Sequence, residues 1–162
     1  MLFLRILIFT VLVPGTVTVA VPYVLQHSDL AFQLAVPGTL RLVGVLSVGL
    51  GVAIYLWCAW NFGAAGKGTP APYDPPRLLV TRGLYRWVRN PIYVGIVLII
   101  LGEGLVFDAG ILLLYSALLL LLFHLRVVVY EEPHLQAKFG ANYDDYCKAV
   151  PRWLPSTRAR KR

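Results

Sequence analysis

The stretch Ile111-Leu-Leu-Leu-Tyr-Ser-Ala-Leu-Leu-Leu-Leu-Leu-Phe-His-Leu-Arg-Val-Val-Val-Tyr130 decides the fold of this chain. It is almost wholly apolar over its length. A bilayer core of about 30 Å needs about 20 helical residues to cross it. The stretch therefore predicts a membrane-spanning helix.

Three further apolar stretches precede it, at residues 2–25, 40–60 and 91–107. The chain has 162 residues, 58% hydrophobic and 14% charged, and a soluble chain this short cannot bury so much apolar surface. Only helices and closed barrels cross lipid, and the sequence lacks the alternation of barrel strands. We expect an all-α integral membrane domain over residues 1–162, with about four transmembrane helices plus short interfacial and C-terminal cytosolic helices.

The basic residues are distributed asymmetrically around these four spans. Every Lys and Arg except Arg41 lies at the start of the first span, between the second and third, or at or after the end of the fourth. The positive-inside rule then places the loop 61–90, the tail 131–162 and both termini in the cytosol, and we expect a bacterial inner membrane. The net charge of +7 thus reflects topology rather than nucleic-acid binding, and the run at 158–162 is expected to meet anionic lipid headgroups.

The first apolar stretch has a second interpretation. Arg5, the apolar run and the small residues near Ala20 are also the elements of a signal peptide. The run is long for a signal peptide, so we favour a span. Its removal would leave three spans and place the chain ends on opposite sides of the membrane.

The segment before the third span predicts an interfacial helix. Thr81 can cap it, and Tyr85 and Trp87 suit headgroup depth. One face would carry three arginines, Arg82, Arg86 and Arg89.

Asn90-Pro91 should end this interfacial helix and begin the third span, with Asn90 as the N-cap and Pro91 as the first helical residue. The free N–H groups of the new helix, with Arg86 and Arg89 beside them, predict an anion site. A lipid headgroup and the carboxylate or phosphate of a specific ligand both remain open as its occupant.

Acidic residues follow the fourth span. His124 and Glu131 lie on one stripe of that helix, and Glu132 comes next. The two carboxylates can pair with Arg86 or Arg89, or bind a ligand, and both alternatives stay open. We expect His124 to face other helices, and the spacing predicts no metal site.

Two packing predictions concern the spans themselves. We expect Glu103 to pair with Arg41, with Asp108 as the alternative partner, because an unpaired charge near the membrane is costly. Ser47, Gly49, Gly51 and Ala53 give small-xxx-small spacings in the second span, which we expect to pack within one chain, so a monomer is favoured. Cys58 and Cys147 are expected to be free thiols.

Two motifs in this chain resemble a known family. The first is Arg82-Gly-Leu-Tyr-Arg-Trp-Val-Arg-Asn-Pro-Ile-Tyr-Val-Gly95 followed by Gly102-Glu103. The second is Glu131-Glu132-x-x-Leu135, then Phe139-Gly-x-x-Tyr143-x-x-Tyr146 and the ending Val150-Pro-Arg-Trp-Leu-Pro155. Together they are similar to the isoprenylcysteine carboxyl methyltransferases and their phospholipid methyltransferase relatives, over about residues 69–155.

The resemblance implies a membrane methyltransferase that uses S-adenosylmethionine at the cytosolic face. The candidate catalytic residues are then Arg89, Glu131 and Glu132. The family positions and the aromatic and polar residues beside them make the candidate cofactor-binding set Tyr85, Arg89, Asn90, Pro91, Tyr93, Gly95, His124, Glu131, Glu132, Tyr143 and Tyr146. Asn90 stands where the family more often has His, and an amide cannot act as an acid or base near neutral pH.

The expected acceptor is lipid-like, with an isoprenylcysteine-type carboxylate favoured, and it should enter sideways from the bilayer. The expected partners are therefore this acceptor and membrane lipids, with no nucleic acid. The alternative is a non-catalytic membrane module that binds anionic lipid or a partner protein through its basic face. A membrane reductase on a related helical scaffold is a further alternative.

Overall fold

The computed structural model describes residues 2–65 and 79–155, and these residues form the predicted all-α fold. Their only β feature is an isolated bridge between Gln33 and Ala109. The elements, in order, are α1 (Leu2–Gly15), η1 (Thr16–Ala20), α2 (Val21–Gln26), α3 (Gly38–Ala65), η2 (Gly83–Arg86), α4 (Pro91–Val106), α5 (Gly110–Arg126), η3 (Val127–Glu131), α6 (Glu132–Phe139) and α7 (Ala141–Ala149). Residues 66–78 of the loop 61–90 and the basic run 158–162 fall outside the described residues.

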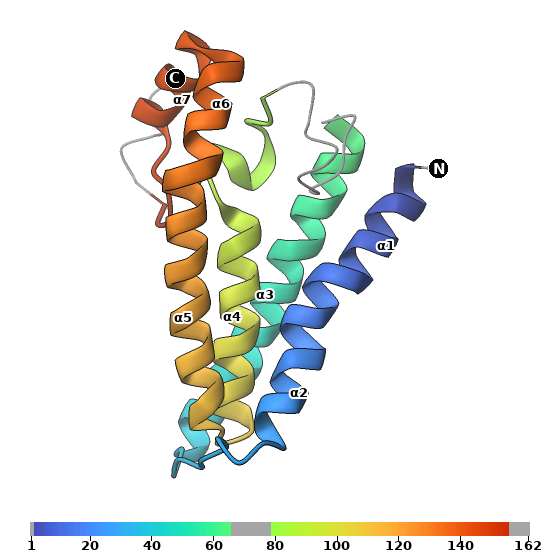
Figure 1. Ribbon diagram of the computed structural model, residues 1–162, viewed down its shortest axis with the longest axis vertical. Coiled ribbons are helices and arrows are strands. Elements are labelled where there is room, and N and C mark those ends of the chain that lie inside the picture. The colour runs from blue at the N-terminus through green and yellow to red at the C-terminus, as the bar shows by residue number, and fades with distance from the viewer. Residues whose placement is uncertain (1, 66–78, 156–162) are drawn as a thin grey trace.

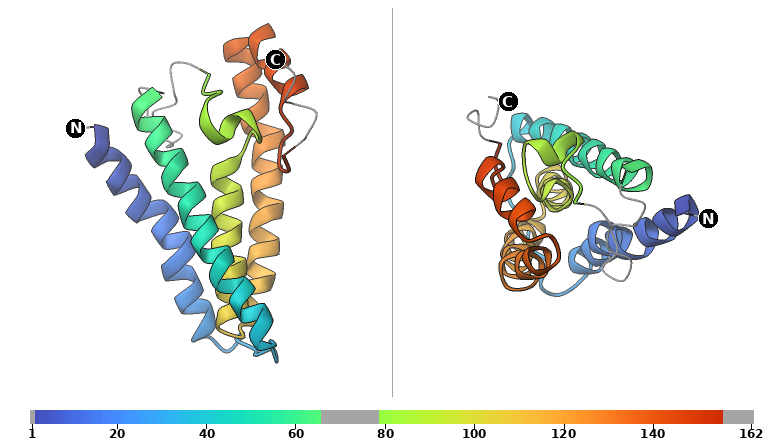
Figure 2. Two further views of the ribbon diagram at one scale, coloured as in Figure 1. Left: turned by 180° about the vertical axis from the view of Figure 1, so that it is seen from behind. Right: turned by 90° about the horizontal axis from the view of Figure 1, so that it is seen from above.

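The long helices form a bundle whose two ends differ (Figure 1). The N-terminus, the end of α3, the start of α4, and α6 with α7 lie at one end, and the connections around residues 27–37 and 107–109 lie at the other (Figures 1 and 2). In both figures α1 diverges from the other helices toward its N-terminus. The charged C-terminal helices therefore share one end with the start of α4.

Two helical segments are long and apolar enough to cross a membrane, Gly38–Asn61 and Gly110–Phe139. The apolar helices Thr10–Gln26 and Pro91–Val106 are shorter. The long helices expose rows of leucine, including Leu42, Leu46 and Leu50 on α3, which are 56–65% exposed. Such rows are expected where lipid, not protein, covers a helix. Four spans remain a prediction.

The core lies where α3, α4 and α5 meet, around the fully buried Ile100 and Leu112. Close approach of α3 and α4 depends on glycine. A Cβ atom on Gly102 would lie 2.6 Å from the carbonyl oxygen of Gly44, and one on Gly51 would lie 2.6 Å from that of Gly95. Small residues allow this backbone contact, as expected for helices packed in lipid.

The hydroxyl of Ser47 adds a hydrogen bond to this interface, to the carbonyl of Leu98 at 2.8 Å. The predicted packing of Ser47 and Gly51 within one chain is therefore confirmed. Gly49 differs, because a Cβ atom there would meet open space.

The predicted pairing of Glu103 with Arg41 is wrong. Arg41 instead binds the alternative partner, Asp108, through both its Nε and Nη2 atoms. Asp108 follows the end of α4 in a left-handed conformation with φ of 56°, which turns its carboxylate back toward the start of α3. The Oε2 atom of Glu103 is buried without a hydrogen-bond partner.

Both π-helical turns, η1 and η3, precede a proline in the second residue of the following helix, Pro22 in α2 and Pro133 in α6. A proline inside an α-helix has no N–H and clashes with the carbonyl four residues earlier. A wider turn relieves this clash and lets the helix continue. The apolar helix of residues 110–126 consequently continues past Pro133 to Phe139.

Candidate functional site

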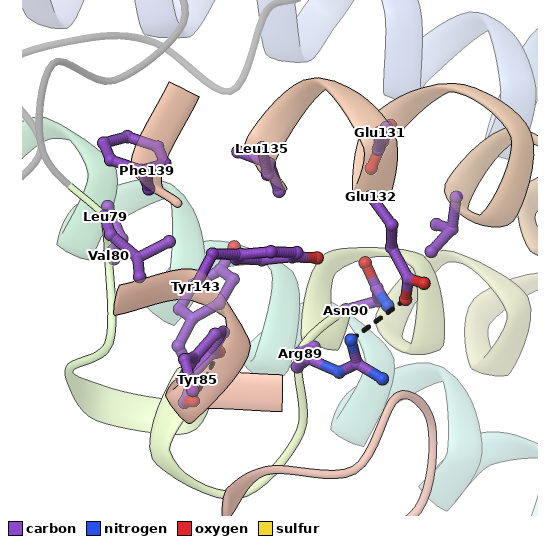
Figure 3. Close-up of a pocket in the computed structure, with 12 residues that line it drawn as sticks. Leu79, Val80, Tyr85, Arg89, Asn90, Glu131, Glu132, Leu135, Phe139 and Tyr143 are labelled. Carbon is purple, nitrogen blue, oxygen red and sulfur yellow. Dashed lines mark hydrogen bonds and ion pairs between the residues drawn. The ribbon is translucent and has the colours of Figure 1, made fainter. Parts of the chain in front are cut away.

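A cavity of about 90 Å³ lies at the end of the bundle that carries the charged helices (Figure 3). One side is polar, with Arg89, Asn90 and Glu132 close together, and the other is apolar, with Leu79, Val80 and Phe139 (Figure 3). The remaining lining residues are Tyr85, Val127, Glu131, Leu135, Tyr143 and Tyr146. The sequence predicts one pocket from residues 82–95 and 124–146; the two segments do meet, and the cavity lining falls within residues 79–90 and 127–146.

The segment that leads to α4 differs from the predicted interfacial helix. It forms only the four-residue 3-10 helix η2, with Arg82 rather than Thr81 at the N-cap position. Gly83, the first residue of η2, has φ of +62°, which a regular right-handed helix does not contain, so the predicted helix is interrupted near its start. The predicted single face of Arg82, Arg86 and Arg89 therefore does not form.

The aromatic residues of this segment also separate. Tyr85 is 8% exposed and lies in the cavity wall, whereas Trp87 is 42% exposed. Tyr85 therefore faces the cavity inside the protein, whereas Trp87 stays at the protein surface, and the depth of both in the membrane remains a prediction.

Helix α4 begins at Pro91 as predicted, but Asn90 does not cap it through its side chain. The Nδ2 atom of Asn90 instead donates a hydrogen bond to the carbonyl of Arg152, at 3.2 Å. The backbone N–H of Arg89 donates to the carbonyl of Pro151, at 2.9 Å. The Asn90 amide thus joins the start of α4 to the C-terminal segment.

Glu131 ends the π turn η3 and accepts hydrogen bonds from two residues. The hydroxyl of Tyr93 donates to its Oε1 atom, and the Nε atom of Arg126 lies 2.8 Å from the same oxygen. Residues five apart in a regular α-helix are about 140° apart around the axis. The π turn brings Arg126 and Glu131 to one side, so the pair depends on it.

Glu132 has different partners, although it is adjacent in sequence. Its Oε1 atom lies 3.0 Å from Nη1 of Arg89, and Arg152 binds both carboxylate oxygens. The hydrogen bond from Arg152 is the main reason why the pKa of Glu132 lies below 4.5, while burial acts in the opposite direction. Glu132 therefore stays ionised at neutral pH. Of the alternatives left open for the two carboxylates, the structure shows Glu132 paired with Arg89, while Glu131 pairs with Arg126.

Arg89 also donates from Nη1 to the sulfur of Cys147, at 2.7 Å, and its Nε atom is buried without a hydrogen-bond partner. Cys58 and Cys147 are both free, as predicted. An orphaned N–H on a partly buried guanidinium can still donate a hydrogen bond to an anionic ligand.

Three tyrosines, Tyr85, Tyr143 and Tyr146, line the cavity in addition to Phe139. The hydroxyl of Tyr146 donates to the carbonyl of Tyr85 at 2.8 Å, and the rings of Tyr143 and Tyr146 are 6.3 Å apart. Burial raises the pKa of all three hydroxyls above their usual range, so each stays protonated. They can offer ring faces and hydroxyl donors but no negative charge.

Four of the predicted cofactor-binding residues lie outside the cavity lining. Pro91 begins α4, and Gly95 packs against Gly51. Tyr93 stacks on Phe123 and reaches the cavity only through Glu131. His124 accepts a hydrogen bond from Trp153, at 3.2 Å between its Nδ1 atom and Nε1.

Sequence reasoning missed six residues at or beside the site: Leu79, Val80, Val127, Leu135, Phe139 and Arg152. Leu135, Phe139 and Arg152 stand within the quoted motifs, which could have pointed to them. Nothing in the sequence around Leu79 and Val80 distinguishes them from other apolar residues. In the described part of the chain, no three His, Cys, Asp or Glu side chains gather as a metal site.

The family model for phospholipid methyltransferases matches residues 40–142, more than half of the chain. The chain belongs to the phospholipid methyltransferase family. The match includes α3 and so extends further toward the N-terminus than the motifs indicated. The match ends at residue 142, so residues 143–155 of this phospholipid methyltransferase family member lie beyond the match.

The relatives of this family member include the following two proteins with functional names. A protein-S-isoprenylcysteine O-methyltransferase of Schizosaccharomyces pombe is 37% identical over 78 residues, which are 48% of this chain and 33% of that protein. A nickel-cobalt-cadmium resistance protein of Alcaligenes xylosoxydans xylosoxydans is 31% identical over 122 residues, 74% of this chain and 52% of that protein. The chain therefore spans between a third and about half of the length of these relatives.

Proposed function

We propose that this protein transfers a methyl group from S-adenosylmethionine to a lipophilic or lipidated acceptor at the cytosolic membrane face. Membership of the phospholipid methyltransferase family and the activity in the name of the Schizosaccharomyces pombe relative support this. The observation that carries the proposal is the cavity itself, because it combines a guanidinium, two carboxylates and aromatic rings in one wall.

These residues fit the chemical groups of the proposed methyl donor. Arg89, with its orphaned Nε atom, suits a carboxylate, and Glu132 suits hydroxyl or ammonium donors. Tyr143 and Tyr146 suit an aromatic ring or a cation such as a sulfonium. When bound, the cofactor would supply an electrophilic methyl group on its sulfonium, and methyl transfer needs alignment and exclusion of water more than a dedicated base.

The cavity is smaller than the proposed ligand. Sites for small molecules usually enclose about 300 Å³ or more, compared with about 90 Å³ in this cavity. The side chains of Arg89 and Glu132 now fill part of the space by pairing with each other. The proposal therefore includes movement of the wall when the ligand binds.

An isoprenylcysteine-type carboxylate is the favoured acceptor. A carboxylate is already ionised at neutral pH, whereas an amine must first lose a proton. The lowered pKa of Glu132 makes this residue a poor base, which favours an acceptor that needs none. Glu132 would then act by binding and orienting.

We also propose four spans, with the cavity at the cytosolic side. The charged helices α6 and α7 lie at the cavity end of the bundle, and the described basic residues other than Arg41 lie at or toward the same end (Figure 1). The positive-inside rule assigns such an end to the cytosol. The acceptor would then reach the cavity from the bilayer, between helices.

Titration of the purified protein with S-adenosylhomocysteine, the demethylated product, tests the proposal. We expect saturable binding by the wild type and binding weaker by about tenfold or more in Arg89→Gln, because a charged hydrogen-bond donor is lost. Arg86→Gln is the matched control, since Arg86 is exposed and does not line the cavity. Absence of binding by folded wild-type protein would contradict the enzyme and favour the membrane-binding module.

A further inference from the structure

The segment after α7, residues 150–155, accepts hydrogen bonds from two residues of the cavity wall. The carbonyl of Pro151 accepts the backbone N–H of Arg89, and the carbonyl of Arg152 accepts the side-chain amide of Asn90. Neither Pro151 nor Arg152 lines the cavity. The segment therefore acts on the cavity only through the residues that it binds.

The side chain of Arg152 makes the strongest of these contacts. Its Nε and Nη2 atoms lie 2.7 and 2.8 Å from the two carboxylate oxygens of Glu132, a planar bidentate pair. Both side chains are partly buried. The adjacent Trp153 donates to His124 and fixes the segment against α5.

The pairing decides where the carboxylate of Glu132 can point. A glutamate has three side-chain torsions, and one contact with Arg89 leaves the plane of its carboxylate undetermined. Two parallel hydrogen bonds from Arg152 fix that plane, and one oxygen still reaches Arg89. A binding group is effective only when the residues behind it hold it in place.

We propose that Arg152 is a positioning residue for the methyl-donor site, which orients Glu132 toward the ligand without touching the ligand itself. This inference rests on the proposed function. It assigns a role in binding to the C-terminal segment, beyond the part of the chain that defines the family match.

The test measures the affinity for S-adenosylhomocysteine of wild type, Arg152→Gln, Glu132→Gln and the double variant. We expect each single variant to bind about tenfold more weakly, and the double variant to bind no more weakly than Glu132→Gln. A residue that merely stabilises the fold would instead weaken binding additively. Lys148→Gln is the control, because it removes the same charge from the exposed face of α7.

Each outcome is decisive. If the wild type binds and Arg152→Gln binds equally well or more tightly, the inference is overturned and the proposed function stands. The same holds if the losses of affinity in the two single variants add up in the double variant. No binding by the wild type overturns both. If Arg152→Gln does not fold, two other comparisons replace it. The double variant, which removes both charges of the pair, is compared with Glu132→Gln. Arg152→Lys is compared with the wild type, and because Lys cannot form the bidentate pair, equal affinity of these two proteins overturns the inference.

Discussion

Arg152 binds both carboxylate oxygens of Glu132, at 2.7 and 2.8 Å, and so ties the segment after α7 to the first turn of α6. The same carboxylate contacts Arg89 at the start of α4. One acidic side chain thus connects three segments that are distant in sequence. Removing it would leave two partly buried guanidinium groups with one partner fewer.

The Glu132 pairing predicts how stability depends on pH. The pKa of Glu132 in the folded protein lies below its ordinary value of 4.5, so its contribution to stability is present above that value and is lost as the pH falls through the lower, folded value. We expect the thermal midpoint of Glu132→Gln to fall less than that of the wild type on acidification below pH 4.5. Asp145→Asn, at an exposed ion pair, should keep the wild-type slope, and equal slopes for all three proteins would contradict the prediction.

Asn90 is predicted to act as a connector rather than as a proton carrier. Asn90→Leu removes the donor to the carbonyl of Arg152 and should lower the free energy of unfolding by about 1 kcal/mol. Asn90→His, which keeps an N–H donor, should recover part of this loss. Thermal unfolding of the three proteins measures the effect, and a Leu variant as stable as the wild type would rule out the connection.

The π turn η3 is predicted to be necessary for binding. Pro133→Ala removes the ring that a regular helix cannot accommodate; with every residue kept, relaxation of η3 to α geometry would rotate Glu132 by about 100° around the helix axis. We expect loss of S-adenosylhomocysteine binding with retention of helical content by circular dichroism. Val129→Ala, at a position that is 72% exposed, is the control and should bind normally. Normal affinity in Pro133→Ala would show that the turn is dispensable.

Contact between α3 and α4 is predicted to tolerate no side chain at Gly102. The added Cβ atom of Gly102→Ala would meet the carbonyl oxygen of Gly44 at 2.6 Å and the backbone nitrogen of Val48 at 2.9 Å. The helices must separate, at a cost of about 1–3 kcal/mol. Gly49→Ala faces open space and should not destabilise the protein. Similar thermal midpoints for the two variants would contradict this packing.

The helical class and the meeting of two motifs were predictable from the sequence because each depends on a strong local pattern. Apolar runs predict helices, and the position of basic residues predicts which helix ends lie together. The start of α4 followed in the same way from Asn90-Pro91, since proline fixes the backbone locally. The short 3-10 helix was missed because the left-handed conformation of Gly83, near the start of the predicted helix, interrupts that helix.

The roles within the site depended on partners that no local pattern specifies. Glu131 and Glu132 are equivalent in sequence, yet a π turn directs one to Tyr93 and Arg126 and the other to Arg89 and Arg152. Glu103 and Asp108 were both candidate partners of Arg41, and Asp108, whose backbone is left-handed, is the one that binds it.

The sequence by itself therefore determined that the chain is a bundle of apolar helices whose described basic residues, apart from Arg41, gather at one end, because hydrophobicity and charge act through composition along the chain. Only the tertiary structure decided that Arg152 holds Glu132, because an ion pair depends on distances between side chains that are 20 residues apart. Two equally charged candidates in a sequence differ only in where the fold places them.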